Sequence, residues 1–356
     1  MKRRLKYFSL SFFVLSLLFQ SLPQLLQACS RVFWSENGVS PLVGRNMDWM
    51  PELQSDLWVL PRNIQRNGLT QENPLQWTSK YGSIVASAYG HATADGLNEK
   101  GLGAHLLWLS ESDYGKRDPK IPGLSASLWA QYFLDNFATV QEAIESLDKK
   151  PFQIATMKIP NTQLTGTVHL ALEDPSGDSA IIEYIKGKPY VYHGKQYKIM
   201  TNEPSYDKQL QNVKQYAGLG GKKYLPGSNN PADRFVRATY YLEQLHKPAT
   251  LNQALAGVLA VMHNVQEVFL TNPDEKNDSP QLSMLWISVM DLSNKVYYFQ
   301  STLGKSLVWV DLKRLNFNVG APVLKFDVSK NLEADGNVQK IFQSSVPFEF
   351  WKADSN

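Results

Sequence analysis

Cysteine is almost absent from this chain, which contains only Cys29 among 356 residues. A disulfide framework, a zinc ribbon and an iron–sulfur cluster held by the chain's own cysteines all need more thiols, so the sequence excludes them. An excess of charge of one sign is also lacking, because 36 basic and 33 acidic residues leave a formal net charge of only +3. A hydrophobic content of 43% excludes a disordered chain, and the length suits one large domain or two modest ones.

Long apolar runs are absent except near the N-terminus, where residues 7–19 follow four basic residues. This run is too short to span a bilayer, and a small residue, Ala28, ends the segment. The pattern predicts a secretory signal peptide at residues 1–28 and export to the periplasm or the extracellular space. Removing its four positive charges from +3 leaves −1 on residues 29–356. That balance gives no basic footprint for nucleic acid.

Cys29 directly follows this segment, and two interpretations of its position remain open. The stretch Leu26-Gln27-Ala28-Cys29 could be a lipoprotein box, in which case Cys29 is acylated and anchors the protein. Alternatively, Cys29 becomes a free N-terminal residue. Gln27 is unusual before an acylated cysteine, and Leu26 suits an ordinary signal peptidase poorly. An upstream cut, after which Cys29 releases its own short propeptide, is therefore a third route.

A free N-terminal cysteine would combine two catalytic groups in one residue. Its thiolate is a nucleophile with an ordinary pKa of about 8.5, and its α-amine titrates at about 7.7–8.0, where it can serve as a base. Such a residue needs a carboxylate to hold the amine, a cation near the sulfur and donors for an oxyanion.

The residues after Cys29 predict a β-hairpin with its turn at Glu36-Asn37-Gly38. The returning strand would bring Arg45 and Asp48 beside Cys29, as a cation for the thiolate and a carboxylate for the ammonium. Taken alone, an Arg and an Asp after a hairpin are more typical of ordinary surface positions.

Several further motifs resemble one enzyme family in their order along the chain. They are Cys29 itself, the stretch Arg45-Asn46-Met47-Asp48-Trp49, and residues 95–102, 200–204, 231–237, 283–290 and 295–301. Together they are similar to the choloylglycine hydrolase family, which comprises bile salt hydrolases, penicillin V acylases and related N-acyl amide hydrolases. The resemblance covers essentially all of residues 29–356, for which it implies a single domain with the N-terminal nucleophile hydrolase fold and no cofactor or metal.

The resemblance also implies roles for individual residues. Cys29 would be the nucleophile and its own amine the base, with Asp48 holding that amine and Arg45 beside the sulfur. Asn202 would donate to the oxyanion, and Arg234 would complete the polar site. The reaction implied is hydrolysis of a linear amide C–N bond in a small N-acyl amide.

One position departs from the Gram-positive pattern of the family. Bile salt hydrolases carry Asn and Gram-positive penicillin acylases carry Tyr where this chain has Trp108, whose indole has one donor and no acceptor. Together with Trp49, it resembles the Gram-negative acylases, whose aromatic pocket takes phenoxyacetyl penicillin and long-chain acyl homoserine lactones. Both indoles are therefore predicted to bind the acyl group, although packing in the core is the alternative from spacing alone.

Three alternatives for function remain at this point. The protein could be a conjugated bile salt hydrolase, a lipid-anchored protein acylated at Cys29, or a binding protein that uses the pocket without turnover. The resemblance further implies a homo-oligomer, a tetramer in the family. The connection between Asn202 and Arg234 is, however, shorter than the assembly loop of Gram-positive members.

Hydrophobic periodicity predicts two sheets between helical layers. The family resemblance implies the same α+β fold in finer detail, an αββα sandwich of two antiparallel sheets. The predicted strands are 83–88, 167–172, 180–185, 283–290, 295–299 and 306–310. The predicted helices are 124–137, 139–147, 234–245 and 251–263, and the predicted loops are 62–73, 205–230 and 272–279. Thr139 and Glu142 suit a capping box. The six histidines lack metal-ligand spacing, and His105 is predicted to be a hydrogen-bonded core residue because it lies in an apolar run.

Overall fold

The computed structural model describes residues 29–50, 53–160, 162, 164–269 and 283–354. The predicted signal peptide at 1–28 and the predicted loop at 272–279 lie outside these residues.

One large sheet contains the strand that begins beside Cys29. In spatial order, its strands are β14 (Ile199–Thr201), β1 (Ser30–Trp34), β2 (Leu42–Trp49), β15 (Ser283–Asp291), β16 (Val296–Ser301), β17 (Val308–Asp311) and β19 (Gly336–Asn337). All neighbours pair antiparallel except β17 and β19. The central strands are covered on both faces, which explains why they read as nearly continuous buried runs.

The second large sheet packs against the first. Its strands, in spatial order, are β13 (Lys188–His193), β12 (Ser179–Ile185), β11 (Val168–Glu173), β8 (Gly103–Trp108), β7 (Ala92–Asn98), β6 (Ser83–Ala88), β3 (Leu57–Leu60), β18 (Val323–Phe326) and β20 (Gln343–Ser345). Two small strand pairs are added, β4 (Gln65–Asn67) with β5 (Gln76–Thr78) and β9 (Gly123–Ser125) with β10 (Gln153–Ala155).

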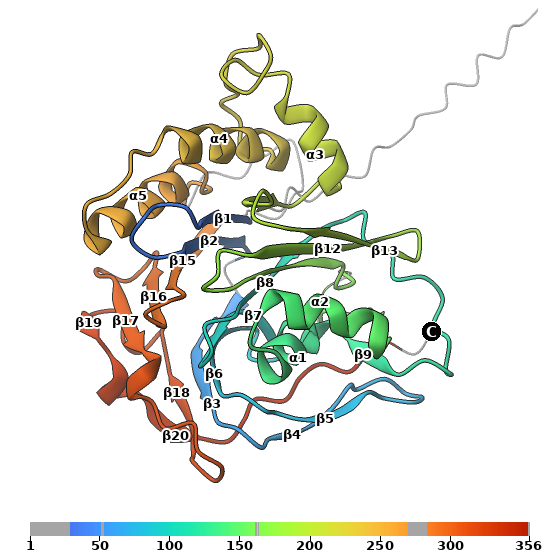
Figure 1. Ribbon diagram of the computed structural model, residues 1–356. Coiled ribbons are helices and arrows are strands. Elements are labelled where there is room, and N and C mark those ends of the chain that lie inside the picture. The colour runs from blue at the N-terminus through green and yellow to red at the C-terminus, as the bar shows by residue number, and fades with distance from the viewer. Residues whose placement is uncertain (1–28, 51–52, 161, 163, 270–282, 355–356) are drawn as a thin grey trace, which may run out of the picture.

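Helices cover the outer face of each sheet (Figure 1). The first sheet carries α4 (Pro231–Gln244) and α5 (Leu251–Asn264), and the second carries α1 (Trp129–Asn136) and α2 (Val140–Lys149). A further helix, α3 (Tyr206–Val213), packs against α4, and short 3₁₀ helices in the described part of the chain include Ala126–Leu128, Leu312–Arg314 and Gln339–Ile341. The predicted αββα sandwich is therefore confirmed. No helix in the described ranges has the length and apolar character to cross a membrane.

Local sequence signals account for several boundaries. Asn37 stabilises the hairpin turn, because its Oδ1 accepts hydrogen bonds from the N–H groups of Val39 and Ser40 at 2.8 and 3.0 Å. Thr139 caps α2 by accepting from the N–H of Glu142 at 3.1 Å. On β2, a Cβ at Gly44 would lie 2.7 Å from Val258 of α5, so glycine permits the close approach of this helix.

The predicted strands are confirmed to within two residues at each end, but three other predictions need correction. The helix predicted from residue 124 begins only at Trp129, because Gly123–Ser125 pairs with β10. The loop predicted at 205–230 contains α3, and the loop predicted at 62–73 contains β4. In each case pairing or packing against a distant segment outweighs a polar or helical local pattern.

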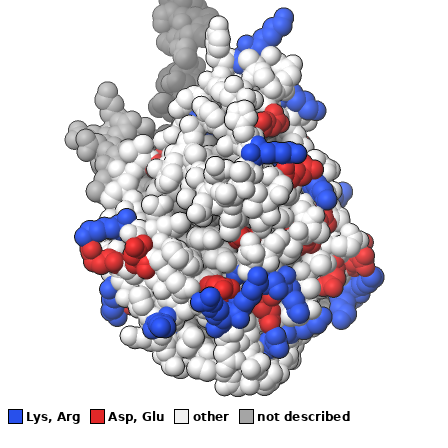
Figure 2. Space-filling model, turned by 60° about the vertical axis from the view of Figure 1, so that its left-hand side comes forward, with Lys and Arg blue, Asp and Glu red and all other residues white. Residues whose placement is uncertain are grey.

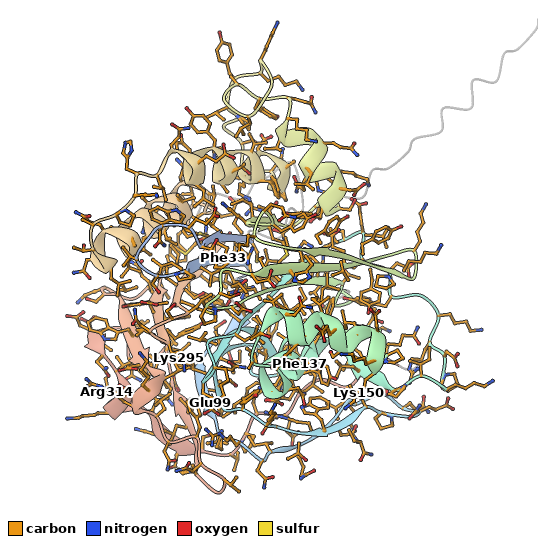
Figure 3. All side chains as sticks on the ribbon, viewed as in Figure 1. Phe33, Glu99, Phe137, Lys150, Lys295 and Arg314 are labelled. Carbon is orange, nitrogen blue, oxygen red and sulfur yellow. The ribbon has the colours of Figure 1, made fainter. Side chains whose placement is uncertain are left out.

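Side chains fill the space between the two sheets (Figure 3). Phe33, labelled on β1 in that view, is fully buried in one hydrophobic cluster with Ala171 of β11 and Ile181 of β12. The guanidinium of Arg31 lies 5.1 Å from the centre of the Phe33 ring. The odd-numbered residues of β1 therefore face the second sheet.

Charged side chains of both signs are mixed on the face shown in Figure 2. Lys and Arg side chains gather toward its lower part, with Asp and Glu among them, and much of the area above is uncharged. This face carries no continuous field of one sign.

Candidate active site

The alternation of β2 distributes the predicted site residues onto two faces. Arg45, Met47 and Trp49 point toward the second sheet and line one cavity with Cys29. Asn46 and Asp48 point the other way, where Asn46 Nδ2 donates to the carbonyl of Met262 in α5 at 2.9 Å. Because successive side chains of a strand face opposite sides, one short segment serves both the sulfur and the backbone of Cys29.

Pairing of β1 with β2 places Cys29 next to this segment. Ser30 pairs with Asn46, and the Sγ of Cys29 lies 3.8 Å from both the Sδ of Met47 and the carbonyl oxygen of Asp48. Cys29 is buried, with 2% of the residue exposed. The predicted hairpin is thus confirmed, and it brings Arg45 and Asp48 to the N-terminal side of β1.

Asp48 is buried beside the guanidinium of Arg234. Its Oδ1 accepts a hydrogen bond from the backbone N–H of Glu267 at 3.0 Å, and its Oδ2 lies 3.9 Å from Nη1 of Arg234. This Oδ2 is buried and has no hydrogen-bond partner among the described residues. A buried carboxylate oxygen without a donor is an uncommon feature in a folded protein.

Arg234, on α4, joins three parts of the site. Its Nη1 donates to the carbonyl of Cys29 at 2.9 Å and to Oγ of Ser30 at 2.6 Å, and its Nη2 donates to Oδ1 of Asn202 at 3.1 Å. The guanidinium therefore holds the start of β1 against α4 and β14. The structure brings Cys29, Asp48, Asn202 and Arg234 into one buried cluster.

Asn202, just after β14, contacts the backbone of Cys29. Its Oδ1 accepts from the N–H of Cys29 at 2.5 Å, and its Nδ2 donates to the carbonyl of Trp108 at 2.9 Å. The amide nitrogen that we expected to face an oxyanion thus binds a backbone carbonyl in this structure. The oxyanion role of Asn202 stays a prediction.

Arg45 lies in the wall of the cavity and is held by carbonyl groups of the second sheet. Its Nη1 donates to Ala94 at 2.9 Å and its Nη2 to Leu106 at 2.8 Å, and its Nη1 lies 3.7 Å from the carboxylate of Asp95. The guanidinium also lies 4.9 Å from the ring centre of Trp286. Its position is therefore set by β7, β8 and β15 together.

Burial and neighbouring positive charge shift the pKa values of Cys29 and Asp48 in opposite directions. Burial raises the pKa of the Cys29 thiol, and the charge of Arg45 is the strongest influence that lowers it. Burial also raises the pKa of Asp48 to about 7, against the lowering effects of Arg234 and the Glu267 N–H. A free ammonium at Cys29 would add a further positive charge beside Asp48 and favour its ionised form.

A fully buried network of ion pairs lies next to Arg45 in the second sheet. The ring of His105 contacts both Asp95 and Glu173, and Glu173 is paired with Arg31. The hydroxyl of Tyr297 donates to Asp95 at 2.6 Å. His105 is therefore a hydrogen-bonded core residue, as predicted, and its two carboxylate partners link the sheets through Arg31 of β1 and Tyr297 of β16.

The cavity beside Cys29 is open to solvent on one side and is lined almost entirely by apolar groups. The rings of Trp49 and Trp108 lie 5.3 Å apart between centres, tilted by 41°, and both line this cavity. The indole N–H of Trp49 donates to the hydroxyl of Tyr89 at 2.7 Å. The structure thus places the two predicted acyl-binding residues in the wall of the cavity that contains the thiol.

Sequence reasoning missed two contributors to this site. Glu267 acts through its backbone N–H, which has no sequence signal, and Tyr89 lies in a turn with a φ of 54°. Tyr89 directly follows the strand predicted at 83–88, and this position at the end of a buried strand is the sequence signal that could have identified it. Within the described part of the chain, no group of three His, Cys, Asp or Glu side chains could hold a metal ion.

Comparison with known proteins identifies relatives along nearly the whole described chain. The family profile described as linear amide C–N hydrolases, choloylglycine hydrolase family, matches residues 29–325. A penicillin V acylase of Pectobacterium atrosepticum is 39% identical over 348 residues, covering 91% of this chain and 92% of that protein. A bile salt hydrolase/transferase of Clostridium perfringens is 27% identical, covering 82% of this chain and 94% of that protein.

Solved structures agree with the architecture. The penicillin V acylase from Agrobacterium tumefaciens superimposes with a TM-score of 0.79 at 41% identity, covering 90% of this chain and 99% of that one. A mutant conjugated bile acid hydrolase from Clostridium perfringens has a TM-score of 0.70 at 23% identity, covering 84% of this chain and 96% of that one, a likeness of fold alone.

Proposed function

The chain belongs to the choloylglycine hydrolase family of linear amide C–N hydrolases, and we propose that it is an acylase whose nucleophile is an N-terminal Cys29. Its substrates are N-acyl amides with an aromatic or long aliphatic acyl group, of the penicillin V or N-acyl homoserine lactone type. The observation that carries the nucleophile is the buried Oδ2 of Asp48, which has no hydrogen-bond donor among the described residues. The ammonium of a free Cys29 supplies such a donor.

Acylation begins when the α-amine of Cys29 takes the thiol proton. The thiolate attacks the amide carbonyl, a C–S bond forms, and the carbonyl oxygen becomes an oxyanion that receives hydrogen bonds from a backbone N–H and the Asn202 amide. Collapse breaks the C–N bond. The leaving amine takes the proton from the α-ammonium, so that a thioester remains on Cys29.

Deacylation repeats these steps with water as the nucleophile. The α-amine takes a proton from water, the oxygen attacks the thioester carbonyl, and the C–S bond breaks as the free acid forms. The thiolate then regains a proton from the α-ammonium. Asp48 stabilises the ammonium in both half-reactions, and Arg45 stabilises the negative sulfur.

The acyl preference is supported by the aromatic wall of the cavity and by two penicillin V acylase relatives near 40% identity. Rings of Trp49 and Trp108 offer flat apolar surfaces beside the thiol. A conjugated bile salt hydrolase is the second candidate, favoured by the 27% identical relative. We further propose export through a signal peptide at residues 1–28, and assembly as a homo-oligomer, a tetramer, which sedimentation of the purified protein tests.

Replacement of the nucleophile tests the mechanism directly. Cys29→Ala should abolish hydrolysis of penicillin V, while circular dichroism should show the same fold. Amide hydrolysis retained by Cys29→Ala would overturn the proposal. Cys29→Ser should also lose activity, because its hydroxyl is far less acidic than the thiol.

Intact mass spectrometry of the exported protein distinguishes the free from the lipidated N-terminus. A chain that begins at Cys29 with no added mass supports the proposal, and a mass increased by fatty acyl groups supports the lipid anchor. Rates on penicillin V, a dodecanoyl homoserine lactone and glycocholate then rank the substrates. A clear preference for glycocholate would favour the bile salt hydrolase, and bound ligand without acid product would favour a binding protein.

A further inference from the structure

The C-terminal tail, residues 346–354, reaches the cavity that contains the thiol. In Figure 1 this terminal segment leaves β20 and crosses the molecule toward the side where β9 lies. Trp351 lines the same cavity as Cys29. The tail lies beyond residue 325, where the family profile ends, so the match to the family says nothing about this wall.

A row of aromatic side chains connects Trp351 with the reactive end. The backbone carbonyl of Trp108 contacts that end by accepting from Nδ2 of Asn202, and its ring lies against Trp49 on the acyl side. Trp49 in turn donates to Tyr89, whose ring centre lies 5.3 Å from that of Trp351. Trp351 is therefore separated from the Trp49–Trp108 pair by Tyr89.

Hydrogen bonds fix the backbone of Trp351 in this position. Its N–H donates to the carbonyl of His91 at 3.1 Å, and its carbonyl accepts from Oγ of Ser125 and Oγ of Ser127, each at 2.8 Å. The ring also stacks on His91 at 5.4 Å with an angle of 18°. These contacts hold the indole against the wall instead of leaving it on a free chain end.

The tail also fastens a second part of the wall. The N–H of Asp354 donates to the carbonyl of Thr156 at 2.8 Å, and Oδ1 of Asp354 accepts from the N–H of Lys158 at 3.1 Å. Met157 lies between these two attachment points, and both Met157 and Ile159 line the cavity. One short segment thus contributes one wall residue directly and holds two others.

We propose that the C-terminal tail sets acyl-chain specificity, with Trp351 as the wall that limits the length of the acyl group. An aliphatic chain attached to the carbonyl at Cys29 runs past Trp49 and Trp108 and ends against Tyr89 and Trp351. Replacing Trp351 by a residue with a smaller side chain opens this end of the cavity to longer acyl chains. This inference rests on the proposed acylase function.

Measuring kcat/KM for hexanoyl, decanoyl, dodecanoyl and tetradecanoyl homoserine lactones tests it. Trp351→Ala should raise the tetradecanoyl-to-hexanoyl ratio by about tenfold, which is the scale on which an apolar pocket discriminates added methylenes. Trp351→Phe should shift the ratio in the same direction by less. It keeps the test available if the alanine variant unfolds.

Phe350→Ala is the matched control from the same tail. Its ring packs on Phe348 at 4.6 Å and under Arg66, and it does not line the cavity. It should leave the length ratio unchanged. A Trp351→Ala variant that changes all four rates by one factor, or a Phe350→Ala variant with the same shift in ratio, would overturn the inference.

Direct binding separates this inference from the proposed function. Calorimetry with free tetradecanoate and hexanoate needs no turnover, so a wild-type protein inactive on every amide refutes the acylase while the wall is still tested. Trp351→Ala should then strengthen binding of tetradecanoate relative to hexanoate. An unchanged ratio of affinities would refute the role of the tail.

Discussion

The two ends of the cavity differ in how their side chains are held. At the reactive end, Cys29, Asp48, Asn202 and Arg234 are almost completely buried, and hydrogen bonds tie them to strands β1, β2 and β14 and to helix α4. At the acyl end, Tyr89, Trp108 and Trp351 are only partly buried. Two of these three residues come from a turn and from the C-terminal tail.

This difference follows from what each end has to do. Bond making at a carbonyl requires polar groups in a narrow range of positions, and buried polar groups are tolerated only when they are paired. Shape recognition of an apolar chain requires surface, which loops and a chain end can supply without hydrogen bonds to the ligand. Changes at the reactive end should therefore affect every substrate alike, and changes at the acyl end should alter preference.

The largest expected effect is that of Asp48→Asn. The amide cannot neutralise the α-ammonium, so kcat should fall about 10³-fold, within the range for loss of general acid–base function. Steady-state rates on penicillin V and on a dodecanoyl homoserine lactone should fall by the same factor. Asp291→Asn, which alters a buried carboxylate of the same sheet away from the cavity, should retain activity. Unequal losses on the two substrates would break the contrast between the ends.

The next largest effect concerns the buried ion-pair network of His105, Asp95 and Glu173 beside Arg45. His105→Leu leaves Asp95 and Glu173 buried without their shared partner, so the free energy of unfolding should fall by about 3 kcal/mol in urea denaturation. His169→Leu is the matched control, because that buried histidine contacts one carboxylate, Glu183, and should cost less. An equal loss of unfolding free energy in the two variants would show that the network stabilises the protein no more than a single His–carboxylate pair.

The effect of His105→Leu depends on pH. Burial opposes a positive charge on His105, but the carboxylates of Glu173 and Asp95 outweigh it and raise its pKa. A raised pKa in the folded state stabilises the protein fully below the unfolded value of about 6.5, and this contribution is lost as pH rises through the folded value. The destabilisation by His105→Leu should therefore shrink as pH is raised above about 6.5.

At the acyl end, Trp108→Ala should act on preference. Loss of the ring removes an aromatic contact and buried apolar area, so kcat/KM for penicillin V should fall about tenfold. The rate on a hexanoyl homoserine lactone should change much less. Trp309→Ala, which removes an indole that does not line the cavity, serves as the control. An equal fall on both substrates would assign Trp108 to the reactive end.

The smallest effect expected is that of Tyr89→Phe. It removes the hydroxyl that accepts from the Trp49 indole at 2.7 Å, a hydrogen bond worth about 1 kcal/mol. We expect a severalfold lower kcat/KM for penicillin V, measured beside Tyr190→Phe, whose tyrosine is 46% exposed. No change would mean that packing alone orients Trp49.

Part of this site could be predicted from local pattern. The turn at residues 36–38 predicts the hairpin, and the hairpin places Arg45 and Asp48 beside Cys29. Strand alternation then sends these two side chains to opposite faces, because its period is two. Asn202 and Arg234 were named only through the family resemblance, since 173 and 205 residues separate them from Cys29.

Other features had no local signal. The helix α3 lies in a segment rich in Gly, Asn and Lys, where composition favours a loop, and it forms through packing against α4. The backbone donor at Glu267 carries no side-chain signature. Trp351 lies 322 residues from Cys29, in a tail without strand or helix periodicity.

Local sequence pattern is enough to place the single thiol, the residues that follow it in the hairpin and the alternation of strands with most helices. These properties depend on neighbours a few residues apart. Tertiary packing sets which buried polar atoms find partners and which do not, and Oδ2 of Asp48 has no hydrogen-bond partner among the described residues. Tertiary packing also decided the cavity, because its walls come from Tyr89, Met157 and Trp351, and only the packing of two sheets brings such distant segments together.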